Sequence, residues 1–84
     1  MKTKERVDLL RRISRVGHLE PVTKIGSSIM SLNTSIHSIR QFVEMGLVRT
    51  NKQKNRTFTE LTQKGKLVVM SDNPEEELKR YISC

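Results

Sequence analysis

The pattern of hydrophobic and polar positions first predicts a helix near the start of the chain. Within residues 3–16 the hydrophobic side chains Val7, Leu10 and Ile13 recur at helical spacing, and charged residues fill the other side. This periodicity is typical of an amphipathic helix with one buried face. Gly17 follows directly and is expected to end the helix, since glycine is common just past helix C-termini.

A second, shorter helix is predicted within residues 21–30. Pro21 suits the first turn of a helix, where its missing N–H is not needed, and Ile25 and Ile29 continue a hydrophobic side. We expect a compact link over residues 31–33 to follow this helix.

The third predicted helix covers residues 34–45. Asn33 or Thr34 can cap its first turn by accepting a hydrogen bond from a free backbone N–H. Its hydrophobic face is formed by Ile36, Ile39 and Val43, with Phe42 beside them. Gly46 is expected to end the helix, because glycine adopts the left-handed conformation at little steric cost.

A β-hairpin is predicted after this helix. Residues 47–50 are short and β-branched enough to form one strand, and residues 56–61 show the alternation expected of a second strand. Residues 51–55 are polar and are expected to form the exposed turn between the two strands.

Two more helices are predicted after the hairpin. Thr62 can cap the first of them. Asn73 and Glu76 form a pair of the capping-box kind, with a proline at the first helical position, so the last helix is expected to begin there. We therefore predict a main domain over residues 1–71 and a C-terminal helical element over residues 72–84.

The charge of the chain is positive and unevenly distributed. Sixteen Lys and Arg residues against nine Asp and Glu residues give a formal net charge of +7. Residues 1–71 hold fourteen basic and five acidic side chains, a net charge of +9, whereas residues 72–84 hold two and four, a net charge of −2. A basic body is typical of a nucleic-acid-binding domain, and we expect the acidic segment to face away from a polyanion.

Several other classes of function find no support in the sequence. Cys84 is the only cysteine, and His18 and His37 have no partners at metal-ligand spacing. The serines have no paired histidine and acid, and no glycine-rich phosphate loop is present. We therefore expect no enzymatic activity, metal, cofactor or small-molecule ligand. The sequence shows no signal peptide and no apolar run long enough to cross a membrane, which predicts a soluble, cytoplasmic protein.

The third predicted helix presents a polar face opposite its hydrophobic one. Hydroxyl, amide, imidazole and guanidinium groups can hydrogen-bond to the edges of bases or to phosphates. The residues of this helix that we expect to contact DNA are Thr34, Ser35, His37, Ser38, Arg40 and Gln41. The alternative is that this face is polar only because it is exposed to solvent.

The hairpin carries a cluster of basic residues: Arg49, Lys52, Lys54 and Arg56. This basic wing, residues 49–56, can lie along the phosphate backbone or enter the minor groove. The alternative is a charged hairpin that only protects an edge strand from aggregation. The first predicted helix has three arginines that could equally belong to a plain solvent face: Arg11, Arg12 and Arg15.

Three stretches of the chain form a recognisable set of motifs: Thr23-Lys24-Ile25, Phe42-Val43-Glu44-Met45-Gly46-Leu47-Val48 and Leu61-Thr62-Gln63-Lys64-Gly65. Together they resemble the winged helix-turn-helix regulators common in archaea, their viruses and bacteria, including the MarR type. In those families a helix typically ends in Gly-Leu-Val or Gly-Leu-Ile, and a variable wing and Leu-Thr-x-Lys-Gly follow. The long flanking helices that form the dimer and ligand pocket of MarR proteins are lacking.

This resemblance implies an α+β fold of the winged helix-turn-helix kind, with a three-helix core, a two-stranded hairpin wing and C-terminal helices. It also implies that double-stranded DNA is bound through the third helix and the wing, usually by a homodimer whose terminal helices pair.

The last predicted helix offers residues for such a dimer. Leu78, Tyr81 and Ile82 form its hydrophobic stripe and could cover a second subunit. The alternative is that they fold back onto their own core. A chain of 84 residues buries a limited core, so a second subunit would stabilise it. Cys84 could link two such tails or be a silent terminus.

The sequence therefore predicts a homodimeric, sequence-specific transcriptional regulator that places residues 34–45 in the major groove and its basic wing on the backbone or in the minor groove. Two alternatives stay open. One is a docking module of the same fold for another protein. The other is a protein that packs DNA without sequence preference.

Overall fold

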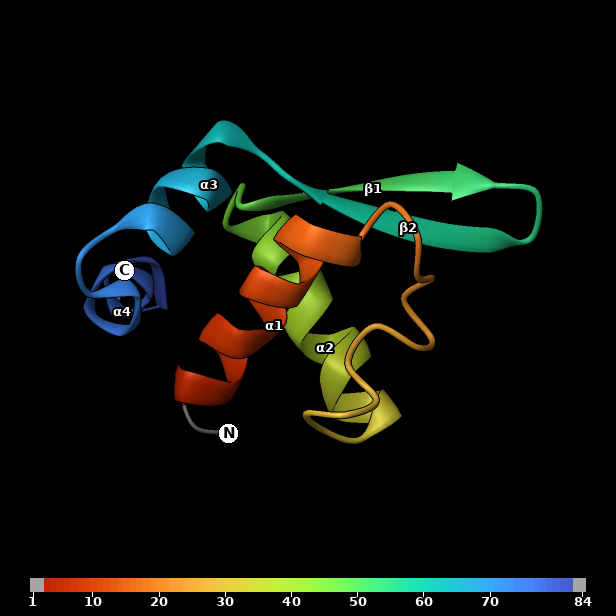
Figure 1. Cartoon of the computed structure of the whole chain (residues 1–84), viewed down its shortest axis with the longest axis horizontal. Helices are drawn as coiled ribbons and strands as arrows, with labels where there is room; N and C mark the ends of the chain where they lie inside the picture. The colour runs from red at the N-terminus through yellow and green to blue at the C-terminus, as the bar shows by residue number, and fades with distance from the viewer. Residues whose placement is uncertain (1–2, 83–84) are drawn as a thin grey trace.

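Four helices and one antiparallel hairpin make up residues 3–82, the part of the chain that this computed structural model describes (Figure 1). In chain order they are α1 (Thr3–Val16), α2 (Leu32–Glu44), β1 (Val48–Gln53), β2 (Arg56–Leu61), α3 (Gln63–Met70) and α4 (Pro74–Ile82). The α+β class predicted from the sequence is confirmed.

Helix α1 has the bounds predicted from its periodicity. Its inner side supplies four residues to the core: Val7, Leu9, Leu10 and Ile13. Gly17 ends the helix, and its amide donates to the carbonyl of Ile13 over 2.9 Å. A Cβ at this position would collide with the backbone oxygen of Thr59 in β2, so the glycine also lets the end of α1 approach the hairpin closely.

The predicted second helix is wrong, since residues 17–31 form a series of turns. The amide of Ile25 donates to the carbonyl of Pro21 over 3.0 Å, and the amide of Met30 donates to the carbonyl of Gly26 over 2.9 Å. These bonds form separate single turns and not a continuous helix. Gly26 and the two serines after it have low helix propensity. Gly26 also lies so close to Ser35 that a Cβ would not fit. The close contact between Gly26 and Ser35 therefore accompanies separate turns in this segment and not a continuous helix.

Helix α2 begins two residues earlier than predicted because Ser31, and neither Asn33 nor Thr34, is its N-cap. The Ser31 hydroxyl accepts from the amide of Thr34 over 3.3 Å and donates to the Thr34 hydroxyl over 2.8 Å. The predicted end of the helix is confirmed. Gly46 has φ +78°, and the amide of Leu47 donates to the carbonyl of Phe42 over 2.9 Å, as in a Schellman motif.

The hairpin is longer, and its turn shorter, than predicted. β1 pairs with β2 from Val48 opposite Leu61 to Gln53 opposite Arg56, which leaves a two-residue turn at positions 54 and 55. Lys54 provides the positive φ, 56°, that this tight turn uses. The polar residues at 51–53 gave no strand signal in the sequence, because their side chains are exposed and only their backbone pairs.

The outer edge of β2 is partly covered by the turn segment. The amide of Thr59 donates to the carbonyl of Gly17 over 3.1 Å, and the amide of Val22 donates to the carbonyl of Thr57 over 2.9 Å. These bonds satisfy backbone groups that an edge strand would otherwise expose, and they attach the hairpin to the helices.

The predicted caps of α3 and α4 are confirmed. The Thr62 hydroxyl accepts from the amide of Gly65 over 3.2 Å and donates to the carbonyl of Gly46 over 2.5 Å, which links the start of α3 to the end of α2. The Asn73 side chain accepts from the amide of Glu76 over 3.4 Å at the start of α4. α4 then packs against α1 and α3.

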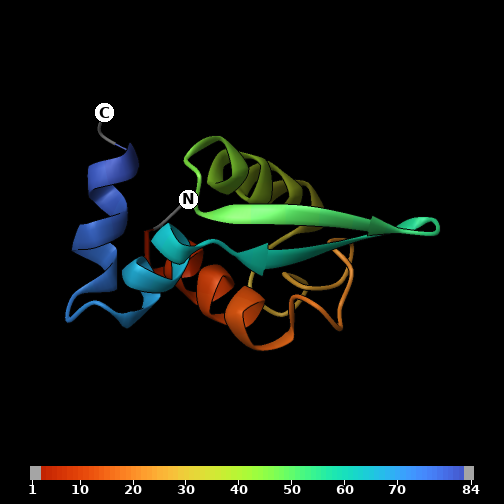
Figure 2. The same cartoon turned by 90° about the horizontal axis from the view of Figure 1, so that it is seen from above.

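The arrangement has two faces and two ends. The Cα trace spans 35 × 25 × 21 Å, with the shortest dimension along the direction of view in Figure 1. Figure 2 shows α1 and α2 on opposite sides of this short dimension, while the hairpin projects from one end and α4 lies at the other. Within residues 3–82, no helix combines the length and apolar character needed to cross a membrane.

Candidate nucleic-acid interface

The exposed face of α2 is narrower than predicted. Four exposed side chains lie on it at helical spacing: Asn33, His37, Arg40 and Glu44. Of these, His37 and Arg40 are predicted site residues. Asn33 was missed because it was assigned to the cap, a position that Ser31 occupies.

Two predicted DNA contacts on α2 are wrong, because Ser35 and Ser38 are buried at 1% and 0% exposure. The aliphatic residues predicted to form the buried face are not all buried, since Val43 is 41% exposed. The inner face is formed by Ser35, Ser38, Ile39 and Phe42. Small side chains take this position since Gly26 packs directly on Ser35. The helix is thereby rotated by roughly a quarter turn relative to the prediction.

Thr34 and Gln41 flank the exposed face and are half-buried. Thr34 is held by the cap at Ser31, so its hydroxyl already has a partner. The side-chain oxygen of Gln41 is buried and has no hydrogen-bond partner within the described residues. Their predicted contacts with DNA stay predictions, with less free surface than expected.

The cations of the hairpin are exposed, and they differ in their pairing. Arg49 lies 3.0 Å from Glu60 on the neighbouring strand, so the only acidic residue of the hairpin neutralises it locally. Lys52, Lys54 and Arg56 have no ion pair within residues 3–82. Three free positive charges therefore lie toward the projecting tip of the hairpin (Figure 2).

A hollow of about 230 Å³ joins α2 to the hairpin. The residues that line it are Val22, Ile36, Ile39, Arg40, Thr50 and Thr57. Arg40 of α2 and the two threonines of the hairpin thus belong to one continuous surface. Guanidinium and hydroxyl groups in such a hollow can bind phosphate oxygens, and the aliphatic side chains beside them can contact an apolar part of a ligand.

The two ends of the molecule differ in charge. The tip of the hairpin is basic, and the opposite end carries the acidic first turn of α4, Glu75–Glu77. Within that helix Glu76 lies 3.5 Å from Lys79 and Glu77 lies 3.7 Å from Arg80, so its cations are offset by its own acids. A polyanion is therefore attracted to the hairpin end and not to α4.

The three residues predicted to form a dimer contact differ in their exposure. Leu78 is 0% exposed and is part of the chain's own core, so the prediction that it covers a second subunit is wrong. α4 turns this side chain inward because the helix packs against α1 and α3. Tyr81 is half-buried and Ile82 is 41% exposed, so for these two the prediction stays open. Cys84 lies outside the described residues.

Within residues 3–82, no three or more His, Cys, Asp or Glu side chains gather as a metal ion would require. Comparisons with protein-family models, with curated proteins and with solved structures found no match. The function of the chain is therefore inferred from its own residues and their arrangement.

Proposed function

We propose that the chain is a DNA-binding protein of the winged helix-turn-helix kind, in which the turns of residues 21–30 take the place of the helix before α2, α2 enters the major groove and the hairpin is the wing. One observation carries this proposal. Three unpaired cations lie on a hairpin that projects beside an exposed helix face, and the hollow lined by Arg40 and Thr50 joins the two elements. A helix and an adjoining basic hairpin suit a groove and the backbone next to it.

The dimensions and chemistry of α2 fit this role. A helix is about 10–12 Å across and the major groove about 12 Å wide, so one exposed helix face can reach the base edges. Arg40 can donate two hydrogen bonds to a guanine, and Asn33 can pair with an adenine. His37 lies between these two positions on the exposed face and can contact a base or a phosphate.

The hairpin supplies affinity that does not depend on sequence. Lys52, Lys54 and Arg56 can each neutralise a phosphate and release a counterion from the duplex. The acidic start of α4 at the far end of the long axis favours the orientation in which the hairpin meets the DNA.

A homodimeric transcriptional regulator is the specific form of this proposal. The resemblance to winged helix-turn-helix regulators supports it, and Tyr81 and Ile82 are the remaining candidates for a contact between α4 helices. Two copies of α2 would then contact half-sites about one helical turn apart.

A second candidate, DNA binding without sequence preference, is favoured by the burial of Ser35 and Ser38. Their loss leaves few hydrogen-bonding side chains on α2, and Glu44 on the same exposed face repels phosphates. The protein would then depend mainly on the hairpin, as in a DNA-packing protein.

Selection of bound sequences from a random duplex pool at near-physiological salt tests both candidates. A regulator enriches a motif, which degrades in Arg40→Ala and keeps its sequence but loses affinity in Lys52→Ala/Lys54→Ala. A packing protein binds the pool without enrichment. The matched control is Lys79→Ala/Arg80→Ala, which removes two charges from α4 and is expected to change neither result. Absence of binding by the wild-type protein contradicts both candidates and favours a protein-docking module.

A further inference from the structure

The outer side of α1 carries positive charge that the proposed interface does not use. Lys4, Asp8, Arg11 and Arg15 recur at helical spacing on the side opposite the core, with a net charge of +2. Arg12 is different, because both oxygens of the Glu20 carboxylate accept from it at 3.0 Å. Arg11 and Arg15 have no ion pair within the described residues. They are four residues apart, so they lie next to each other on the helix surface.

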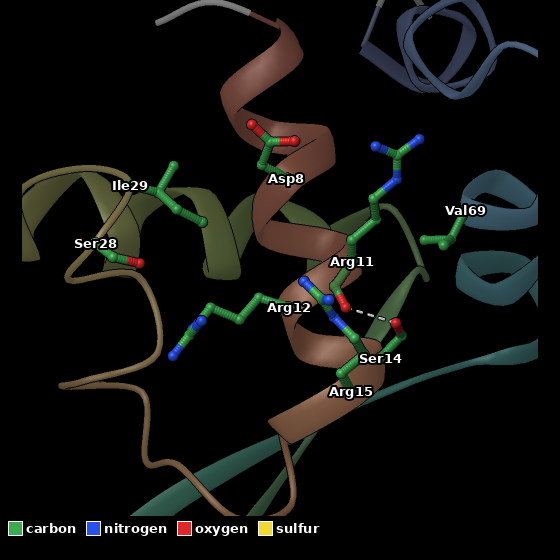
Figure 3. A pocket seen from close by; sticks show the side chains of 8 residues that line it. All are labelled: Asp8, Arg11, Arg12, Ser14, Arg15, Ser28, Ile29 and Val69. Atoms are coloured by element: carbon green, nitrogen blue, oxygen red, sulfur yellow. Dashed lines mark hydrogen bonds between the residues drawn. The ribbon is translucent and has the colours of Figure 1, made fainter.

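These two arginines line a shallow depression of about 630 Å³ (Figure 3). Its apolar edges come from Ile29 in the turn segment and Val69 in α3. Figure 3 shows the guanidinium groups of Arg11 and Arg15 above the surface of α1, from where both can reach a ligand. The depression therefore has two forked donors without an ion pair in the described part of the chain, the Arg11 guanidinium extending from one side of α1 and the Arg15 guanidinium lying across it (Figure 3).

This face belongs to a different side of the molecule from α2, while the hairpin packs against both helices. α1 and α2 lie on opposite sides of the shortest dimension of the molecule, 21 Å (Figure 2). DNA has a persistence length of about 150 bp, so over the 35 Å length of this protein a duplex is a straight rod. A duplex that receives α2 in its groove cannot bend around the molecule to reach Arg11 and Arg15.

We propose that the outer face of α1, centred on Arg11 and Arg15, binds a second DNA duplex, so that the protein bridges two duplexes. This inference rests on the proposed DNA binding by α2 and the hairpin. Arg11 and Arg15 are about one helical turn apart along α1, a rise of about 6 Å, so their guanidiniums can contact separate phosphates of one duplex. Binding at this face uses the backbone only and has no sequence preference.

One acidic group opposes this binding. The Asp8 carboxylate lines the same depression and reduces its positive charge. Removing this charge is expected to strengthen capture of the second duplex, whereas removing the arginines weakens it. Substitutions at Asp8 and at the two arginines are therefore expected to change capture in opposite directions.

A bridging assay tests the inference. A duplex is fixed on beads, the full chain is added, and capture of a second, fluorescent duplex is measured from 50 to 200 mM salt. In parallel, anisotropy measures the affinity for a single short duplex. For Arg11→Gln/Arg15→Gln we expect capture to fall at least about tenfold and its salt slope to fall by about 1.8, two phosphates at about 0.9 each. Single-duplex affinity should change less than about threefold, because the remaining interface is intact.

Two further variants complete the design. Asp8→Asn should increase capture. Lys79→Gln/Arg80→Gln, which removes the same charge from α4, should leave capture unchanged. Sedimentation of the protein alone checks that the oligomeric state is the same in all variants.

Four results would overturn the inference. Capture that persists in Arg11→Gln/Arg15→Gln would show that bridging comes from two α2 faces of a dimer. An equal loss of capture and of single-duplex affinity would place the arginines in the same interface as the hairpin. Single-duplex binding by the wild type without any capture would refute bridging and leave the proposed function intact, whereas absence of all DNA binding would refute both.

Discussion

The salt dependence of DNA binding should depend on three side chains of the hairpin. Lys52, Lys54 and Arg56 are exposed and have no ion pair within residues 3–82, so each is free to neutralise one phosphate. Replacing all three by glutamine should lower the slope of log K against log salt by about 2.7, since each phosphate contributes about 0.9. Between 50 and 200 mM salt, the wild type should therefore lose roughly 40-fold more affinity than the triple variant.

Fluorescence anisotropy with one labelled duplex at four salt concentrations measures this slope. The wild type and the triple variant should approach each other in affinity as salt rises. The matched control is Lys64→Gln/Lys79→Gln/Arg80→Gln, which removes three charges from α3 and α4 and should change the slope by less than about one contact, 0.9. Equal slopes in the wild type and the hairpin variant, with circular dichroism showing both folded, would refute the assignment of the hairpin to phosphates.

The remaining predictions concern buried or tightly packed positions of the fold. Each is measured as the free energy of unfolding in urea, and the last is also measured as DNA affinity. Leu78→Ala should cost about 2–5 kcal/mol because its side chain is fully buried in the core, and a cost below about 1 kcal/mol would show that α4 is not part of the fold. Gly65→Ala should be destabilising although alanine normally favours a helix, because the added Cβ would meet the carbonyl of Leu47. Gly46→Ala should cost only about 1–2 kcal/mol, because Gly46 has a positive φ but open space around it. A larger cost for Gly46→Ala than for Gly65→Ala would contradict this packing. Ser35→Ala should leave stability equal or higher and DNA affinity unchanged, because the hydroxyl is buried and has no hydrogen-bond partner within residues 3–82; a tenfold loss of affinity would restore it as a DNA contact.

Local signals in the sequence were sufficient to predict most elements. α1 has both a hydrophobic period and Gly17, and these two signals agree on its bounds. Thr62 and Asn73 cap α3 and α4 through bonds that involve only residues three positions away. Gly46 ends α2 because the required conformation is a property of glycine itself. Such features depend on neighbours in the chain, so a single sequence contains them.

The errors arise where contacts distant in sequence decide the structure. The segment 21–30 has a helical period, but Gly26 is pressed against α2, and no local signal shows that contact. The same contact buries Ser35, which hydrophobicity alone places outside. Leu78 could have covered a partner or its own core, and only the packing of α4 on α1 decides for the core.

Because few side chains on the exposed face of α2 can read bases, the oligomeric state decides between a sequence-specific regulator and a DNA-packing protein. Arg40 and Asn33 can each make one bidentate base contact, and each contact discriminates against a wrong base by about 1–3 kcal/mol. Specific binding typically exceeds non-specific binding by about 4–10 kcal/mol, so one copy of α2 reaches at most the lower part of that range. Two copies on adjacent half-sites double the discrimination and can reach it. A monomer with this surface would therefore bind DNA largely through the hairpin and without sequence preference, whereas a dimer could act as a sequence-specific regulator.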